Sequence, residues 1–233
     1  MITSSQDRLA GRLAERVRRG PALRPLPWRV CHAARDLMGA DGASLTLEDT
    51  TPGRVTLCVT DRRAELLEDL QDVLREGPCL SAFATGEPAT APLGGSAAAQ
   101  WPRFAAAARR IIGPAGVLWS VPMRPGGQTM GTVTWYRLAA GQLSESLVAA
   151  LPMADAAGAM LLTDPQAFLE SPQPGSWSSR AVIHQATGML IAQLGVSADR
   201  ALAILRGYAY EHHTELRAVA TAVTSHQLDL SHP

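Results

Sequence analysis

Residues 178–224 read SSRAVIHQATGMLIAQLGVSADRALAILRGYAYEHHTELRAVATAVT, and their apolar pattern constrains how the C-terminal part of the chain folds. Apolar residues recur there at the spacing that places them on one face of an α-helix. Gly195 is typical of a helix end, Ser197 of a helix N-cap, and Thr214 of the start of a third helix. Such short helices are marginal alone in water, so their apolar stripes must pack together. The sequence therefore predicts a three-helix bundle.

Gly188 lies in the middle of the first predicted helix, where glycine costs about 1 kcal/mol relative to alanine. A close crossing with another helix would explain a small residue at this position. The alternative is that the glycine is simply tolerated.

Five short segments of this stretch keep a recognisable spacing: 179–183 (SRAVI), 185–190 (QATGML), 197–201 (SADRA), 205–206 (LR) and 216–220 (LRAVA). Together they closely resemble the ANTAR domain, a family of three-helix RNA-binding modules at the C-termini of bacterial transcription antitermination regulators. One departure is Thr187, which stands where members often have lysine. The resemblance implies an RNA-binding bundle.

Polar side chains outside the apolar stripes are the candidate RNA contacts, because arginine can pair with phosphate and stack on splayed bases. The candidates are Arg180, His184, Thr187, Arg200, Arg206, His212, His213 and Arg217. From residue 178 onward, however, the sequence has four arginines and four acidic residues, so their charges balance. Since RNA binders usually have a basic face, an alternative is a bundle that binds a protein partner.

Composition favours a soluble, cytoplasmic protein with one medium domain and one small domain. The chain has 233 residues, 46% of them hydrophobic, and 21 basic residues balance 21 acidic ones. No apolar run approaches the roughly 18 residues of a membrane span, and the N-terminus lacks a signal-peptide core. Cys31, Cys58 and Cys79 are widely spaced without a CxxC pattern, which argues against disulfides and zinc and favours buried packing roles.

Residues 5–19 form a predicted amphipathic helix, with Leu9, Leu13 and Val17 on one face and five arginines on the other. Such a basic segment can touch nucleic acid or membrane. Packing of the narrow leucine stripe on another helix or on the following domain is the preferred interpretation.

Residues 23–162 contain segments with the two-residue period of β-strands and segments with the 3.6-residue period of α-helices. Residues 45–47 and 55–60 alternate apolar and polar side chains, as do residues around 117–119 and 132–136, which predicts two β-hairpins. In the second strand of the first hairpin, Val55, Leu57 and Val59 alternate with Thr56, Cys58 and Thr60. Helical stripes are predicted before the first hairpin, from Asp61 to the Gly77-Pro78 stop, and over 101–112. The result is an α+β fold with an antiparallel sheet.

This region also resembles the GAF sensor domains, particularly those that precede ANTAR modules. The resemblance rests on 40–43 (ADGA), 70–71 (LQ), 76–79 (EGPC), 85–88 (TGEP), 101–104 (WPRF), 121–123 (VPM) and 131–133 (GTV). It implies an antiparallel sheet with helices on both sides, frequent dimerisation, and an unidentified small ligand between the sheet and one helix layer. Cys79, Trp119 and Trp135 are the expected lining residues.

Catalysis and metal binding find little support in the sequence. Ser44 and Ser96 do not complete a nucleophile elbow, and His32 is the only histidine before residue 178. His212 and His213 are adjacent, so on a helix their side chains point apart, and no metal site or cofactor is predicted. Cys79 is the one residue with a conceivable reactive role, and a packing role is preferred.

The predicted organisation has five parts. They are an N-terminal amphipathic helix (1–20), a GAF-like sensor (21–163), a proline-rich linker (164–177), an ANTAR-like RNA-binding bundle (178–225) and a tail (226–233). Within the sensor's closing helix, over 143–162, Pro152 predicts a bend or two shorter helices. The expected protein is a homodimeric, non-enzymatic antitermination regulator, in which the sensor controls binding of hairpins in nascent RNA. The alternative is a sensing scaffold that binds protein.

Overall fold

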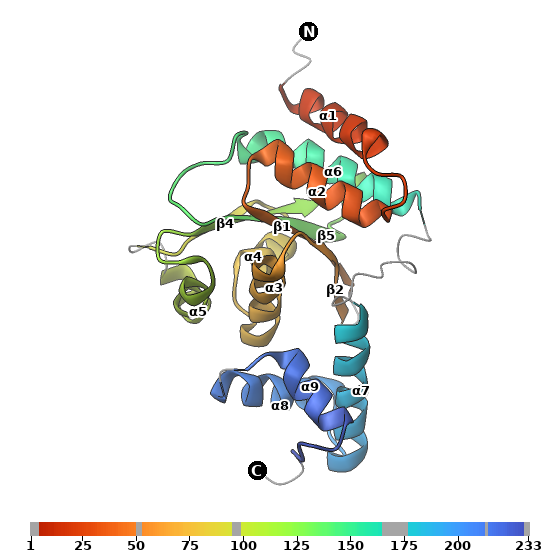
Figure 1. Ribbon diagram of the computed structural model, residues 1–233, viewed down its shortest axis with the longest axis vertical. Coiled ribbons are helices and arrows are strands. Elements are labelled where there is room, and N and C mark those ends of the chain that lie inside the picture. Colours follow the sequence, from red (N-terminus) through yellow and green to blue (C-terminus); the bar gives the residue numbers. More distant parts are fainter. Residues whose placement is uncertain (1–4, 50–52, 95–98, 165–176, 213, 231–233) are drawn as a thin grey trace. The chain divides into compact units, whose positions relative to one another are not determined.

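The computed structural model of the chain describes residues 5–49, 53–94, 99–164, 177–212 and 214–230. Its internal contacts divide the chain into two compact units. The larger unit holds the residues up to 171 except 72–74, and the smaller one holds those three residues and the C-terminal helices (Figure 1). Each unit is described by itself. The predicted proline-rich linker lies almost wholly outside the described residues.

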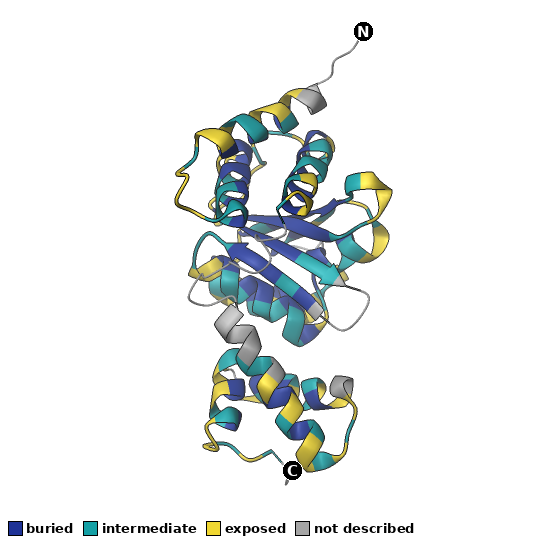
Figure 2. Cartoon of the chain, turned by 90° about the vertical axis from the view of Figure 1, so that its right-hand side faces the viewer, coloured by how far each residue is buried: buried dark blue, intermediate teal, exposed yellow. Residues whose placement is uncertain are grey.

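Among the described residues of the larger unit, five strands form one antiparallel sheet. They are β1 (Gly42–Asp49), β2 (Gly53–Val59), β3 (Ala89–Pro92), β4 (Val117–Met123) and β5 (Gly131–Arg137), in the spatial order β2-β1-β5-β4-β3. A turn at Pro125–Gly127 joins β4 to β5, as the glycine pair predicts. The sheet lies between two helix layers, and Figure 2 shows its buried strands sandwiched by them. The predicted α+β class is thus confirmed.

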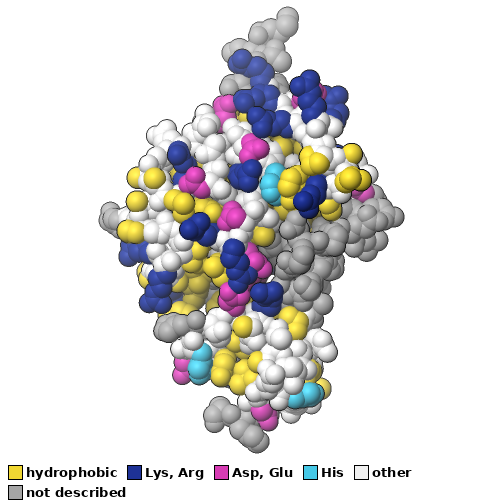
Figure 3. All heavy atoms as spheres, viewed as in Figure 1, with side chains coloured by type: hydrophobic (Ala, Val, Ile, Leu, Met, Phe, Trp, Pro, Cys, Tyr) yellow, Lys and Arg dark blue, Asp and Glu magenta, His cyan; other side chains and the backbone are white. Residues whose placement is uncertain are grey.

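One helix layer consists of α1 (Ser5–Arg19), α2 (Leu26–Met38) and α6 (Leu147–Leu162). Leu9, Leu13 and Val17 of α1 are each at most 4% exposed and belong to the main core. This confirms the packing interpretation of the N-terminal helix. The described arginines of α1 are exposed and lie outside this core. Figure 3 shows basic side chains, in dark blue, gathered on the surface at this end of the larger unit.

The other face of the sheet carries α3 (Arg62–Leu74) and α4 (Pro78–Thr85), with α5 (Pro102–Ile112) on the same side in Figure 1. Asp61 caps α3, since its Oδ1 accepts hydrogen bonds from the backbone nitrogens of Arg63 at 2.8 Å and Ala64 at 3.0 Å. The sequence did not predict α4 or β3. Gly77-Pro78 indicated only a stop, yet proline also suits the first position of a helix, and α4 begins at Pro78.

Helix α6 runs unbroken through Pro152, so the expectation of two shorter helices is wrong. Pro152 is the sixth residue of α6, and its missing N–H removes one hydrogen bond near the N-terminal end. Buried residues on both sides of the proline, including Ala149, Ala150, Met153 and Ala154, hold the helix against the sheet. Packing therefore outweighs the local penalty.

The described part of the smaller unit contains the three predicted helices: α7 (Trp177–Leu194), α8 (Ala198–Glu211) and α9 (Leu216–Thr224). Gly195, with φ 64°, follows α7, and the Ser197 hydroxyl accepts from the Arg200 backbone nitrogen at 3.3 Å to cap α8. Thr214 does not start the third helix. Its backbone nitrogen instead donates to the Ala209 carbonyl at 2.9 Å, and α9 begins two residues later.

No helix among the described residues combines the length and apolar character that crossing a lipid bilayer would need.

Candidate functional site

The C-terminal bundle closes its own apolar core. Its fully buried members are short or branched apolar residues contributed by all three helices: Ala186, Leu190, Ala201, Leu205, Ala209, Leu216, Val219, Ala220 and Val223. These are the positions that the helical periodicity predicts. Polar residues between them are left outside the core, and they supply the candidate binding surface.

The described arginines of the bundle are spread over α8 and the start of α9. Arg200 is exposed in the first turn of α8, whereas Arg206 and Arg217 are half-buried. Arg206 lies six positions after Arg200, which places the two residues about 120° apart around the helix axis. They therefore do not share one face of α8. Arg217 lies 3.9 Å from Glu215, and with side chains 41% and 32% exposed this pair holds the arginine only weakly.

Thr187 is a packing residue, and the structure does not support its assignment as an RNA contact. Its side chain is 9% exposed, and its hydroxyl donates to the Ile183 carbonyl at 2.7 Å. For Gly188, the structure favours the second of the two interpretations, a glycine that is simply tolerated. A Cβ at this position would meet no other atom within 4 Å, so no close helix crossing within the bundle requires the glycine.

His212 forms a flat aromatic pair with Tyr208 one helical turn earlier. Their ring centroids lie 3.9 Å apart with 15° between the planes, and His212 Nδ1 lies 3.0 Å from the Tyr208 carbonyl oxygen. His212 is exposed. Of the other predicted contacts, His213 and the side chains of Arg180 and His184 lie outside the described part.

A second candidate site is a buried polar cluster on the α3/α4 face of the sheet. The Arg54 guanidinium of β2 donates to the Glu68 carboxylate of α3, and both side chains are 3% exposed. Glu68 also accepts hydrogen bonds from the hydroxyls of Ser44 at 2.6 Å and Thr46 at 3.2 Å, both on β1. Buried ion pairs need such additional partners to offset the cost of leaving water. The cluster thus ties α3 to the edge of the sheet.

Cys79 extends this cluster from the start of α4. Its sulfur lies 2.6 Å from an Arg54 nitrogen and 2.8 Å from the Thr132 hydroxyl, while its backbone nitrogen donates to Gln71 Oε1 at 2.8 Å. Burial raises the pKa of the Cys79 thiol to about 12, although the Arg54 charge opposes this. Cys79 is therefore a neutral, packed thiol.

The segment Glu76-Gly77-Pro78-Cys79 owes its composition to these contacts. Gly77 has φ 142°, and a Cβ there would lie 2.5 Å from Gln71 Oε1. The Glu76 carboxylate accepts from the backbone nitrogens of Arg103 at 3.1 Å and Phe104 at 3.2 Å, at the start of α5. The segment thus connects three helices, which is a structural role.

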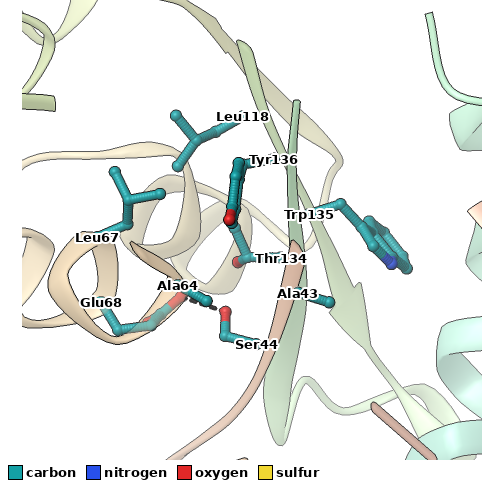
Figure 4. Close-up of a pocket in the computed structure, with 9 residues that line it drawn as sticks. All are labelled: Ala43, Ser44, Ala64, Leu67, Glu68, Leu118, Thr134, Trp135 and Tyr136. Carbon is teal, nitrogen blue, oxygen red and sulfur yellow. Dashed lines mark hydrogen bonds between the residues drawn. The ribbon is translucent and has the colours of Figure 1, made fainter. Parts of the chain in front are cut away.

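A small cavity lies beside the ion pair, between α3 and the sheet (Figure 4). Residues of α3, β1, β4 and β5 line it: Ala43, Ser44, Ala64, Leu67, Glu68, Leu118, Thr134, Trp135 and Tyr136. Its volume is about 10 Å³, which is about the room of one water molecule. Any larger ligand needs the α3 face to open.

The three residues expected to line a sensor pocket do not share one. Cys79 lies on the α3/α4 face, whereas Trp119 and Trp135 belong to the core under α1, α2 and α6. In Figure 4 the Trp135 ring points away from Glu68 across the sheet. Strand alternation explains the separation, because Thr132 and Thr134 face Cys79's side while Trp135 faces the other. The sequence did not predict a role for Arg54 and Glu68, which are the charged residues of the cluster.

Within the described residues, no group of three or more histidine, cysteine or acidic side chains is placed to hold a metal ion.

Comparisons with known proteins identify the C-terminal bundle. Residues 176–223, which include α7, α8 and most of α9, match the family model of the ANTAR domain. No curated protein matches the chain.

The solved structures that are similar to the chain include the following two. One is the crystal structure of the A. aeolicus nlh2 GAF domain in an inactive state, with 12% identity, a TM-score of 0.41, and coverage of 68% of this chain and 96% of that one. The other is a domain of a two-component sensor histidine kinase protein from Sinorhizobium meliloti 1021. It has 16% identity, a TM-score of 0.43, and coverage of 61% of this chain and 92% of that one.

Proposed function

We propose that this chain, whose residues 176–223 form an ANTAR domain, is an RNA-binding regulator of transcription. The observation that carries the proposal is the coincidence of the family match with a bundle that buries its own apolar core. Because this core is complete without the arginines, their guanidinium groups can serve in contacts to a partner. In this proposal the chain binds and regulates and does not catalyse.

Arginine contacts to phosphates and loop bases supply the proposed affinity. Exposed Arg200 and half-buried Arg206 and Arg217 can each donate several hydrogen bonds in a planar fork, which suits both phosphate and base edges. On α8 and the residue after it, the Tyr208–His212 pair offers a flat aromatic surface of the kind on which splayed bases stack. Since the bundle has no excess of positive charge, recognition relies on these local contacts more than on bulk attraction.

The proposed target is a hairpin in nascent RNA. In a homodimer, two bundles would hold two adjacent hairpin loops and so prevent formation of a transcription terminator. The larger unit would control this step as a GAF-like sensor, with a small ligand entering on the α3/α4 face. The small cavity beside Arg54 and Glu68 supports this location. A polar ligand there would replace a hydroxyl group, such as that of Ser44, as a hydrogen-bond partner of the Glu68 carboxylate.

Filter binding with purified full-length protein tests the proposal. The RNAs are a tandem pair of short hairpins, a single hairpin, and an unstructured strand of equal length, each at several salt concentrations. The expected result is tightest binding to the tandem hairpins, with affinity falling as salt rises. Equal, weak binding to all three RNAs would overturn the RNA proposal and favour a protein partner for the bundle.

A further inference from the structure

A β-bulge places the Cys58 side chain on the face of the sheet opposite to the one that strict alternation predicts. Leu45 pairs with Cys58 and Thr46 pairs with Thr56, so Leu57 is an extra residue between two pairs. Cys58 therefore lies with Leu57 in the apolar core under α2, away from the polar face that carries Thr56. Bulges commonly re-aim a side chain in this way.

The bulge brings Cys58 next to Cys31 of α2. The Cys31 sulfur lies 3.9 Å from the Cys58 carbonyl oxygen, and both side chains are fully buried free thiols. The interaction with the Cys58 thiol, together with burial, raises the pKa of Cys31 well above its ordinary value. The same interaction lowers the pKa of Cys58 to about 6, although burial opposes that shift. Of the two thiols, Cys58 is therefore the one that loses its proton more readily.

His32, the residue after Cys31, supplies a base. Its Nδ1 lies 3.0 Å from the Trp28 carbonyl oxygen, which can only accept a hydrogen bond. This contact assigns the proton to Nδ1 and leaves the lone pair of Nε2 to accept a thiol proton. Hydrogen bonding to His32 is a further cause of the lowered pKa of Cys58. The imidazole also stacks on the Trp28 ring, with centroids 3.7 Å apart, which fixes its orientation.

The pair has a route toward solvent. His32 and Trp28 are both partly exposed, and the Arg24 guanidinium lies 5.1 Å from the centre of the Trp28 ring. In the proposal below, a small oxidant reaches the buried Cys58 from the side of these partly exposed residues. Cys79, by contrast, lies on the other face of the sheet within the Arg54–Glu68 cluster.

We propose that Cys58 and Cys31 form a redox-active dithiol that hydroperoxides convert to a disulfide, with Cys58 as the nucleophile, His32 as the base and Cys31 as the resolving thiol. In the first step, His32 takes the Cys58 proton and the thiolate attacks the terminal peroxide oxygen. The O–O bond breaks, and the alcohol or water leaves with the proton, giving a sulfenic acid on Cys58. In the second step the Cys31 sulfur attacks the Cys58 sulfur and water leaves. Two thiols lose two electrons, and the hydroperoxide gains them.

The resulting bond would join α2 to β2 across the core of the larger unit. This inference goes beyond RNA binding and does not depend on it, because its products are read directly by mass. The wild-type protein gives the first test. After brief treatment with a small excess of hydrogen peroxide, peptide mapping without reductant is expected to show a Cys31–Cys58 crosslink and an unmodified Cys79.

Variants assign the roles. In Cys31→Ser the sulfenic acid on Cys58 is expected to persist and to be trapped by dimedone, whereas Cys58→Ser should show no such adduct on Cys31. His32→Gln is expected to slow oxidation by about 100-fold with the same product. Cys79→Ser is the matched control and should leave rate and product unchanged. Recovery of Cys31 and Cys58 as free thiols, or oxidation that begins only after unfolding, would overturn the proposal. The peptide map of the oxidised wild-type protein tests the proposal even if a variant fails to fold.

Discussion

Arg54 and Glu68 form an ion pair in which each side chain is only 3% exposed. The partners lie on different elements, β2 and α3, so the pair is a tertiary contact that joins a helix to the sheet. Its surroundings are polar, with hydroxyls of β1 on the carboxylate and the Cys79 sulfur on the guanidinium. Both members of the pair therefore have further polar partners, and loss of either member would leave the charge of the other buried without a counter-charge.

Glu68→Gln should destabilise the larger unit strongly. The neutral amide leaves the buried Arg54 charge without its counter-charge, and breaking a buried pair in this way costs about 3–5 kcal/mol. The free energy of unfolding from urea denaturation measures the loss. Glu65→Gln on the same helix is the control, because its pair with Arg62 is partly exposed and should change stability by less than about 1 kcal/mol. Equal effects of the two substitutions would contradict the buried pair.

Alkaline pH should weaken the fold through Cys79. Its folded pKa of about 12 lies above the ordinary value of 9.0, so its contribution is complete below pH 9 and is lost as pH rises from there toward 12. At about pH 10.5 the expected loss is about 2 kcal/mol from this group. Cys31 and Tyr136 shift in the same direction and add to the decline.

Cys79→Ser isolates the Cys79 contribution, since serine keeps a hydroxyl at the site and does not titrate. Urea denaturation at a series of pH values should show a shallower decline above pH 9 in the variant than in the wild type. Parallel curves for the two proteins would mean that the thiol ionises as freely in the folded state as in the unfolded chain.

Gly188→Ala should stabilise the C-terminal bundle. The added methyl group meets no atom within 4 Å, and alanine is favoured over glycine inside a helix by about 1 kcal/mol. The thermal midpoint of the bundle should therefore rise by a few degrees. A lower thermal midpoint would mean that the added methyl group clashes with another part of the protein that packs against Gly188. If RNA affinity drops while the midpoint rises, the α7 surface at Gly188 belongs to the RNA interface.

Ser197→Ala should cost the bundle about 1 kcal/mol through loss of the α8 cap. Ser225→Ala is a comparison at a hydroxyl that follows α9 and donates to the Thr221 carbonyl instead of capping an N-terminus. Circular dichroism during thermal unfolding compares the two variants. A Ser197→Ala variant as stable as the wild type would show that the bundle does not depend on this cap.

The sequence predicted those elements whose signal is local. The C-terminal helices follow from a regular apolar spacing, and the cap of α3 follows from the position of Asp61 before an apolar stripe. The hairpins follow from alternation and glycine turns. Helix α4 was missed because Gly77-Pro78 serves both as a stop and as a start.

What depends on tertiary pairing could not be predicted. Alternation assigns Cys58 to the face of Thr56, and only the pairing with β1 shows that Leu57 is an extra residue. Likewise, Glu68 interrupts an otherwise leucine-rich stripe, but its partner Arg54 lies on another element, and no periodicity connects the two. The chain alone also does not show on which face of the sheet α4 packs, so Cys79 was grouped with Trp119 and Trp135.

The most direct test of the central claim is the affinity of tandem-hairpin RNA for the full-length Arg200→Ala/Arg206→Ala double variant. Removing two arginine contacts should weaken binding by about 1–3 kcal/mol for each and should flatten its salt dependence. Arg109→Ala/Arg110→Ala, on α5 of the larger unit, removes the same charge and should bind as the wild type does. If both double variants bind this RNA as tightly and with the same salt dependence as the wild type, the arginines of α8 do not hold RNA.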